Sequence, residues 1–133
     1  MNRTVPSLSA GAWARVTFYG LAGLAGAALT ARFNVQWSED QGGFNIADYV
    51  RAGFANSAST SFSIDLIVAA TVGVLFMAVE GARLRIRMTT PLILTAFLIA
   101  FAFAFPAFLA VRELKLGRLV DIAAGTDGSH DQR

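Results

Sequence analysis

The fold class is decided by the stretch from Pro91 to Val111, which reads PLILTAFLIAFAFAFPAFLAV. It holds no charged residue, and a helix of this length covers the ~30 Å hydrocarbon core of a bilayer at about 1.5 Å per residue. Two further apolar blocks lie upstream of it. We therefore predict an all-α integral membrane protein, a three-helix bundle with spans over about 15–32, 62–82 and 91–111.

The composition agrees with this class and excludes several others. Of the 133 residues, 55% are hydrophobic and 15% are charged, against roughly 45–50% and about 25% in soluble domains. The net charge of +2 gives no reason to expect nucleic-acid binding. There is no cysteine and only one histidine, His130, and no metal, cofactor or catalytic motif is recognisable. We expect no cofactor and no metal, and more readily a non-enzyme than an enzyme.

The rest of the chain divides around the spans. Residues 1–14 form a short N-terminal segment, residues 15–118 a single membrane domain, and residues 119–133 a polar tail that we expect to be disordered. The first apolar block has an alternative interpretation as a cleaved signal peptide, with Arg3 before it and Ala25-Gly26-Ala27 inside it. A charge at Arg15 and the glycines of this block favour a packed helix.

A short amphipathic helix is predicted over residues 45–54 of the first loop. Asn45 can cap it, and Ile46, Tyr49, Val50 and Phe54 recur with helical spacing. So short a helix needs an interface to support it. We expect it to be an interfacial helix on the membrane surface, with a helical turn in a solvated loop as the alternative.

Three spans place the N-terminus and the hairpin between the second and third spans on one side of the cell membrane, and the C-terminus on the other. Basic residues are divided almost evenly between the sides. Five lie on the N-terminal side and six on the C-terminal side: Arg3, Arg15, Arg83, Arg85 and Arg87 against Arg32, Arg51, Arg112, Lys115, Arg118 and Arg133. The dense, acid-free hairpin favours a cytoplasmic N-terminus.

Charges in or near membrane spans need a partner or a role. Because the second and third spans are expected to be antiparallel, the candidate polar residues fall into two clusters at opposite faces. One cluster contains Asn56, Ser59, Asp65, Arg112 and Glu113, and the other contains Glu80, Arg83 and Arg15. They either anchor helix ends as ion pairs, or Asp65 forms a polar pocket with Asn56 and Ser59.

The remaining patterns favour helix packing. Gly20, Gly23 and Gly26 allow close approach of another helix to the first span. In the third span, Pro106 is expected to free the carbonyl of Ala102 and to kink the helix. Four phenylalanines also form a stripe there, which fits a bundle core or a lipid face better than a ligand site: Phe97, Phe101, Phe105 and Phe108.

From Phe54 to Lys115 the chain resembles the bacterial membrane protein family called domain of unknown function 2834. The resemblance rests on the motifs Phe-x-Asn-x-x-Ser, Phe-x-x-Asp, Glu-x-x-Arg and Phe-Ala-x-Pro-x-Phe-Leu-x-x-Arg-Glu, which here begin at Phe54, Phe62, Glu80 and Phe103. The chain departs from the family at Ser57, where a proline is usual, and at Arg85, where the family tends to glycine. The resemblance implies a small integral membrane protein and no particular activity.

Two functional hypotheses follow. The first is a non-enzymatic subunit that packs in the lipid bilayer against itself, as a homo-oligomer, or within a larger membrane complex. The alternative is a membrane enzyme or binding protein for an isoprenoid-like or quinone-like ligand, with Asp65 as its acid and the phenylalanine stripe as its apolar wall. A transporter ranks last, because three helices enclose too little of a pathway.

Overall fold

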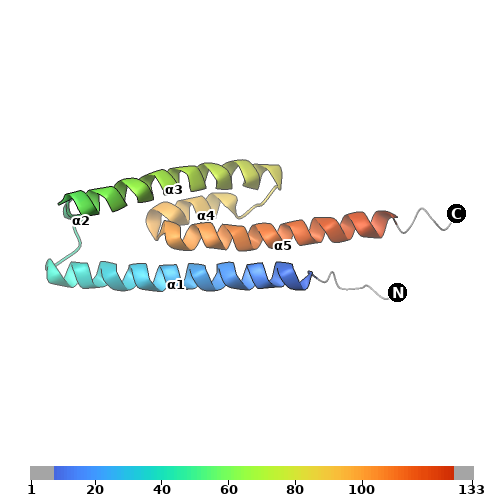
Figure 1. Cartoon of the computed structure of the whole chain (residues 1–133), viewed down its shortest axis with the longest axis horizontal. Helices are drawn as coiled ribbons and strands as arrows, with labels where there is room; N and C mark the ends of the chain where they lie inside the picture. The colour runs from blue at the N-terminus through green and yellow to red at the C-terminus, as the bar shows by residue number, and fades with distance from the viewer. Residues whose placement is uncertain (1–7, 128–133) are drawn as a thin grey trace.

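The structure is a computed structural model that describes residues 8–127, and this part of the chain is all-helical (Figure 1). Its five helices are α1 (Ala10–Asp40), α2 (Ile46–Gly53), α3 (Ser57–Arg83), α4 (Thr89–Leu98) and α5 (Phe101–Asp127). Helices α1 and α3 are each long and apolar enough to cross a membrane, and α4 is a shorter apolar helix. The chain therefore has two candidate membrane helices, and they cover the first two predicted spans.

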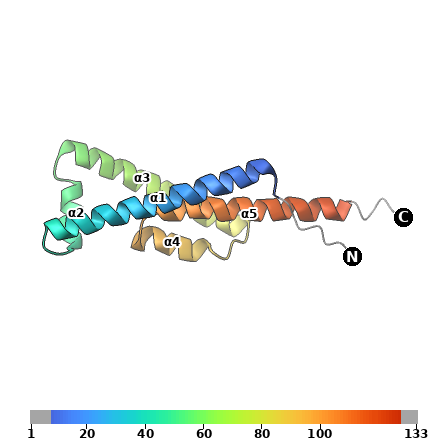
Figure 2. The same ribbon diagram turned by 90° about the horizontal axis from the view of Figure 1, so that it is seen from below.

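The third predicted span is wrong as a single helix. The stretch 91–111 is interrupted at Ile99 and Ala100, and α4 and α5 run back along each other as a hairpin (Figures 1 and 2). The turn is held by the Thr95 carbonyl, which accepts hydrogen bonds from the amides of Ile99 and Ala100 at 2.9 and 3.2 Å. Pro106 lies inside α5 and not at the break.

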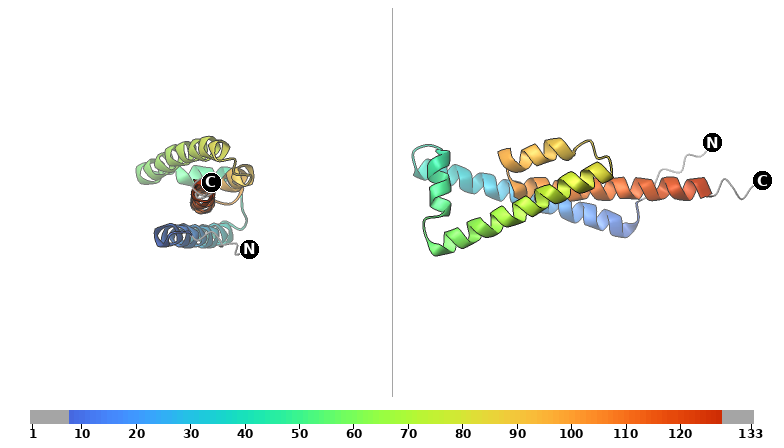
Figure 3. Two further views of the ribbon diagram at one scale, coloured as in Figure 1. Left: turned by 90° about the vertical axis from the view of Figure 1, so that its right-hand side faces the viewer. Right: turned by 90° about the horizontal axis from the view of Figure 1, so that it is seen from above.

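Helix α5 occupies the centre of the bundle. Helix α1 packs along one side of it, while α3 and α4 pack on another side, as the end-on view in Figure 3 shows. Within the described residues, no Cα atom of α1 lies within 8 Å of a Cα atom of α3. The buried core lies where α3, α4 and α5 meet. It contains two fully buried side chains, Met77 and Phe108, and Phe108 makes an edge-to-face contact with Phe76.

Because of the hairpin, the beginning and the end of the described chain lie at the same end of the bundle. The start of α1 and the second half of α5 are adjacent, because Leu8 and Ala12 lie beside Leu116 and Gly117. The loop between α3 and α4 is at this same end, whereas α2 is at the other. We expected the two termini at opposite ends, and within residues 8–127 that expectation is wrong because the chain turns back inside the predicted third span.

Two boundaries differ from the sequence expectations. Helix α1 continues to Asp40, through residues that we expected to form a loop. Helix α5 continues to Asp127, so the predicted disordered tail over 119–133 is wrong for residues 119–127. Residues 128–133 and His130 among them lie outside the described part.

Helix α2 lies within the predicted amphipathic segment, and Asn45 is its N-cap. The Asn45 side chain accepts hydrogen bonds from the amides of Ala47 and Asp48. Tyr49 attaches α2 to the end of α1. Its hydroxyl donates to the Asn34 side chain at 2.8 Å, and its ring meets that of Trp37 edge to face.

A candidate functional site of linked ion pairs

Glu80, near the end of α3, is the centre of an ion-pair network. Its side chain is 9% exposed. Both carboxylate oxygens accept hydrogen bonds from Arg83, one turn along the same helix, at 2.7 Å. Oε1 also accepts from Nε of Arg112 on α5 at 2.7 Å. Glu80 therefore joins α3 to the central helix.

Glu113, the next residue on α5, extends the network to α1. Its side chain is 11% exposed, and Oε2 accepts from Nε of Arg15 at 3.0 Å. Oε1 lies 3.6 Å from Nη1 of Arg112, which connects the two halves. One continuous chain of charges thus links α1, α5 and α3, with three arginines around two carboxylates.

This arrangement is suited to holding helices together. Each carboxylate faces two guanidinium groups, so its charge is matched within the chain. Within the described residues, no buried side-chain nitrogen or oxygen lacks a hydrogen-bond partner. The same residues contain no group of acidic or histidine side chains that could hold a metal ion.

The network corrects the expected division of the charges. Glu80 does meet Arg83, but we had placed Arg112 and Glu113 at the opposite face, beside Asp65. That assignment is wrong, because α5 runs parallel to α3 after the hairpin and brings Arg112 to the level of Glu80. Sequence analysis found these residues and missed their pairing.

Asn56 and Ser59 serve to cap α3. The Asn56 side chain accepts from the Ser59 amide at 2.9 Å, and the Ser59 hydroxyl is within hydrogen-bond distance of the Asn56 amide at 3.2 Å. This reciprocal pair is a capping box. Asn56 is exposed and Ser59 is partly buried, and neither forms a hydrogen bond with Asp65. The expected polar pocket is therefore absent from the described residues.

Asp65 faces outward from α3. The residue is exposed, and its side chain forms no hydrogen bond or ion pair within residues 8–127. Arg32, in the later part of α1, is likewise exposed and unpaired within that range. Sequence analysis placed Asp65 in an ion-pair cluster and did not consider Arg32 as a site residue.

The glycines of α1 divide between two faces. Gly23 and Gly26 face α5, and a Cβ atom on Gly26 would lie 2.7 Å from the carbonyl oxygen of Ala102. Pro106 has no amide hydrogen to offer this carbonyl, which is therefore free to lie against the glycine. Gly20 differs from these two, since a Cβ atom there would meet nothing within 4 Å.

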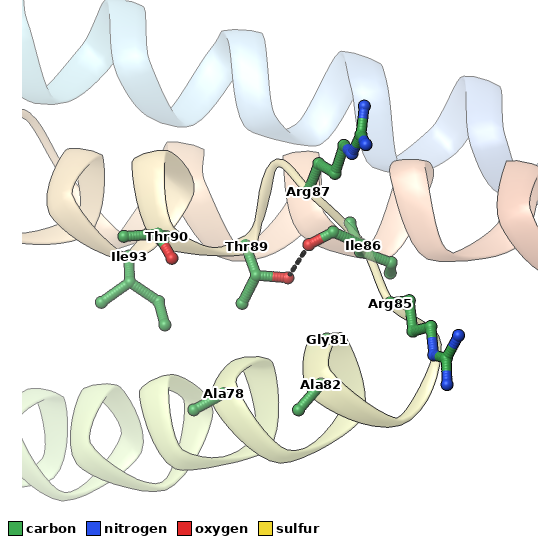
Figure 4. Close-up of a pocket in the computed structure, with 9 residues that line it drawn as sticks. All are labelled: Ala78, Gly81, Ala82, Arg85, Ile86, Arg87, Thr89, Thr90 and Ile93. Carbon is green, nitrogen blue, oxygen red and sulfur yellow. Dashed lines mark hydrogen bonds between the residues drawn. The ribbon is translucent and has the colours of Figure 1, made fainter.

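A pocket of about 470 Å³ lies beside the turn between α3 and α4 (Figure 4). Gly81 and Thr89 line it, and the Thr89 hydroxyl donates to the Ile86 carbonyl at 2.9 Å. In this turn the amides of Arg85 and Ile86 bond to the carbonyls of Ala82 and Gly81, which is a Schellman motif. Arg85 has a φ of 50°, a region that favours glycine.

A smaller groove of about 290 Å³ lies between α3 and the α4–α5 hairpin. Apolar side chains line it, including those of Ile67, Phe97 and Phe101. Among the lining residues, Thr71 alone carries a hydroxyl group. Asp65 does not line this groove. The acid and the apolar wall that the lipophilic-ligand hypothesis requires are therefore separated.

Comparison with known proteins identifies a family but no characterised relative. The family described as protein of unknown function DUF2834 matches residues 18–114. This match begins within α1, and so extends well upstream of the motifs that start at Phe54. No curated protein and no solved structure matches the chain.

Proposed function

The chain belongs to the DUF2834 family, to which no function is assigned, and from its own residues we propose that it is a non-enzymatic accessory subunit of a membrane assembly. The observation that carries the proposal is the exposed, unpaired side chain of Asp65. This carboxylate projects from one of the two candidate membrane helices with no partner in the described part of the chain. A charge on the outer surface of a membrane helix is costly unless another group receives it.

The internal contacts support an assembly role over catalysis. The network at Glu80 and Glu113 is satisfied within the chain, so it stabilises the fold and leaves no free acid there. By contrast, Asp65 is surrounded on α3 by exposed apolar side chains such as Leu66, Val68 and Val72. An apolar face that carries one unsatisfied charge suits contact with another protein.

For the topology, we propose two complete crossings, α1 and α3, and a re-entrant α4–α5 hairpin that enters and leaves on one side. The amides of Ile99 and Ala100 at its tip both donate to the Thr95 carbonyl, so the irregular backbone leaves neither of these amides unpaired. Both ends of the described chain then lie on the same side as the α3–α4 loop.

With this topology, the basic residues are distributed unevenly between the two sides, so the positive-inside rule supports one orientation. Seven described basic residues lie at the end with the α3–α4 loop, and two lie at the α2 end: Arg15, Arg83, Arg85, Arg87, Arg112, Lys115 and Arg118 against Arg32 and Arg51. We propose that the first end is cytoplasmic in the cell membrane. Reporter fusions at the N-terminus and at the C-terminus should both be active in the cytoplasm. Opposite locations would contradict the hairpin topology.

The accessory role is tested by purification. The detergent-solubilised protein should be recovered with copies of itself or with another membrane protein, and Asp65→Asn should weaken that association. Recovery as a lone monomer would contradict the proposal. Mass spectrometry of co-purifying lipids tests the alternative, since a lipid retained by the wild type and lost from Asp65→Asn would favour the lipophilic-ligand hypothesis.

A further inference from the structure

Asp65 and Arg32 are two unpaired, opposite charges on the outer surfaces of the two candidate membrane helices. We infer that they pair between copies, so that α3 of one copy packs against α1 of the next with Asp65 facing the Arg32 of that copy. This inference rests on the proposed assembly function and assigns its partner as a second copy of the chain.

The first argument is depth. Gly73 of α3 lies against Phe101, and Gly26 of α1 lies against Ala102, so both glycines are near the tip of the hairpin. Asp65 precedes Gly73 on α3 by eight residues, about 12 Å of helix toward the α2 end. Arg32 follows Gly26 by six residues, about 9 Å toward the same end. The difference of about 3 Å is within reach of an arginine side chain.

The second argument is that this match is kept between copies. All copies in a membrane share one orientation, so groups at equal depth in one chain are at equal depth in its neighbours. In the proposed contact, α1 and α3 run in opposite directions. Each step toward the α2 end therefore adds one residue number on α1 and subtracts one on α3, so residues that match in depth at one level also match along the rest of the contact. From the same reference glycines, Ala28 and Val72 are about 3 and 1.5 Å toward the α2 end.

The third argument is the position of each charge on its helix. On α1 an exposed stripe at spacings of three and four includes Phe18, Leu21, Ala25 and Ala28 and ends at Arg32. On α3 a similar exposed stripe begins at Asp65 and continues through Val68, Val72, Leu75 and Val79. Such spacing places each stripe on one side of its helix. The stripes therefore offer two apolar surfaces, each with one charge.

The fourth argument is that one molecule cannot form this pair internally. Helices α1 and α3 lie on different sides of α5, and within the described residues no Cα atom of one lies within 8 Å of a Cα atom of the other (Figure 3). The stripe on α1 is opposite Gly23 and Gly26, which face α5. The two surfaces thus point away from each other, and contact between them is head to tail, which generates a ring or a row of copies.

Disulfide cross-linking tests this contact directly, because the chain has no native cysteine. Two differently tagged chains, one with Ala28→Cys and the other with Val72→Cys, are co-expressed and oxidised in native membranes. A head-to-tail contact predicts a disulfide-linked dimer that carries both tags. Each cysteine variant expressed alone should give no dimer, since like positions do not meet.

Charge substitutions then test the ion pair. Asp65→Arg or Arg32→Asp alone should reduce the cross-linked fraction several-fold, and the two together should restore it. Asp48→Asn on α2 is the control and should leave the fraction unchanged. Restoration by the double variant also shows that each altered chain still inserts and folds.

The outcomes distinguish this inference from the function on which it rests. A dimer formed by Val72→Cys alone would show an α3–α3 contact and overturn the head-to-tail arrangement. Recovery with a different membrane protein, without any Ala28–Val72 disulfide, would overturn the inference and keep the accessory role. A lone monomer in both membranes and detergent would overturn both.

Discussion

The contact between α1 and α5 makes opposite predictions for two glycines on the same helix. A Cβ atom on Gly26 would lie 2.7 Å from the carbonyl oxygen and 3.0 Å from the Cβ of Ala102. Ordinary van der Waals contact begins at about 3.4 Å, so α1 must move outward by several tenths of an ångström. The obstacle is backbone, and it can yield only if a whole helix shifts. At Gly20 a Cβ atom meets nothing within 4 Å.

The magnitudes follow from two opposing effects. Replacing glycine by alanine inside a helix stabilises it by about 1 kcal/mol, and this gain applies at both positions. Overpacking costs about 1–3 kcal/mol, and this loss applies at Gly26 alone. We expect Gly20→Ala to raise the free energy of unfolding by about 1 kcal/mol. The free energy of unfolding of this variant should exceed that of the Gly26→Ala variant by about 2 kcal/mol.

The assay is reversible unfolding by sodium dodecyl sulfate in mixed micelles, followed by far-ultraviolet circular dichroism. Both variants add one methyl group to α1, and they differ only in the atoms that surround this group. Equal shifts of the unfolding midpoint for Gly20→Ala and Gly26→Ala would refute the close approach of α1 to the hairpin. A larger loss at Gly20 would place the packing surface on the other side of α1.

Three further substitutions test local features in the same unfolding assay. Arg85→Gly should stabilise the protein by about 1 kcal/mol, because it removes a side chain from a positive φ, and destabilisation would contradict the turn geometry. Ser57→Pro should stabilise by about 0.5 kcal/mol, because the residue after an N-cap is the favoured helical position for proline; a loss there would show that α3 begins elsewhere. Glu80→Gln should lower the midpoint clearly more than Glu39→Gln, whose carboxylate has no partner in the described chain, and equal effects would argue against the network.

Much of the helical framework could be predicted from the sequence. Apolar length alone located the helices that became α1 and α3, and the capping preference of asparagine located the start of α2 at Asn45. The two departures from the family pattern, Ser57 and Arg85, coincide with a first helical position and a positive φ. These features depend on local chemistry, which a sequence displays directly.

The hairpin could not be predicted in this way. The stretch from Pro91 to Val111 is uniformly apolar, so its composition is the same for one long helix and for two helices that turn back. The break at Ile99 and Ala100 has no glycine, proline or polar residue to mark it. It is fixed by tertiary contacts, with Phe101 against Gly73 and Ala102 against Gly26.

The pairing of the charged residues in the candidate site could not be predicted without knowledge of that turn. Scarcity of charge made Glu80, Arg112, Glu113 and Arg15 easy to find, since each is costly near a membrane. Which of them pair depends on whether α5 runs parallel or antiparallel to α3, and one turn reverses that relation. Asp65 changed from a presumed partner of Arg112 to an unpaired surface charge for the same reason.

The proposed re-entrant hairpin also implies an order in which the helices enter the membrane. Helix α4 has ten residues, and α5 carries charges from Arg112 onward, so neither half can enter a bilayer by itself as a complete span. Helices α1 and α3 are synthesised first and can insert independently. In the proposed topology, the glycine surface of α1 then faces lipid until the C-terminal third of the chain packs against it. A chain truncated after α3 should therefore reach the membrane and remain there as an unfinished, protease-sensitive helix pair.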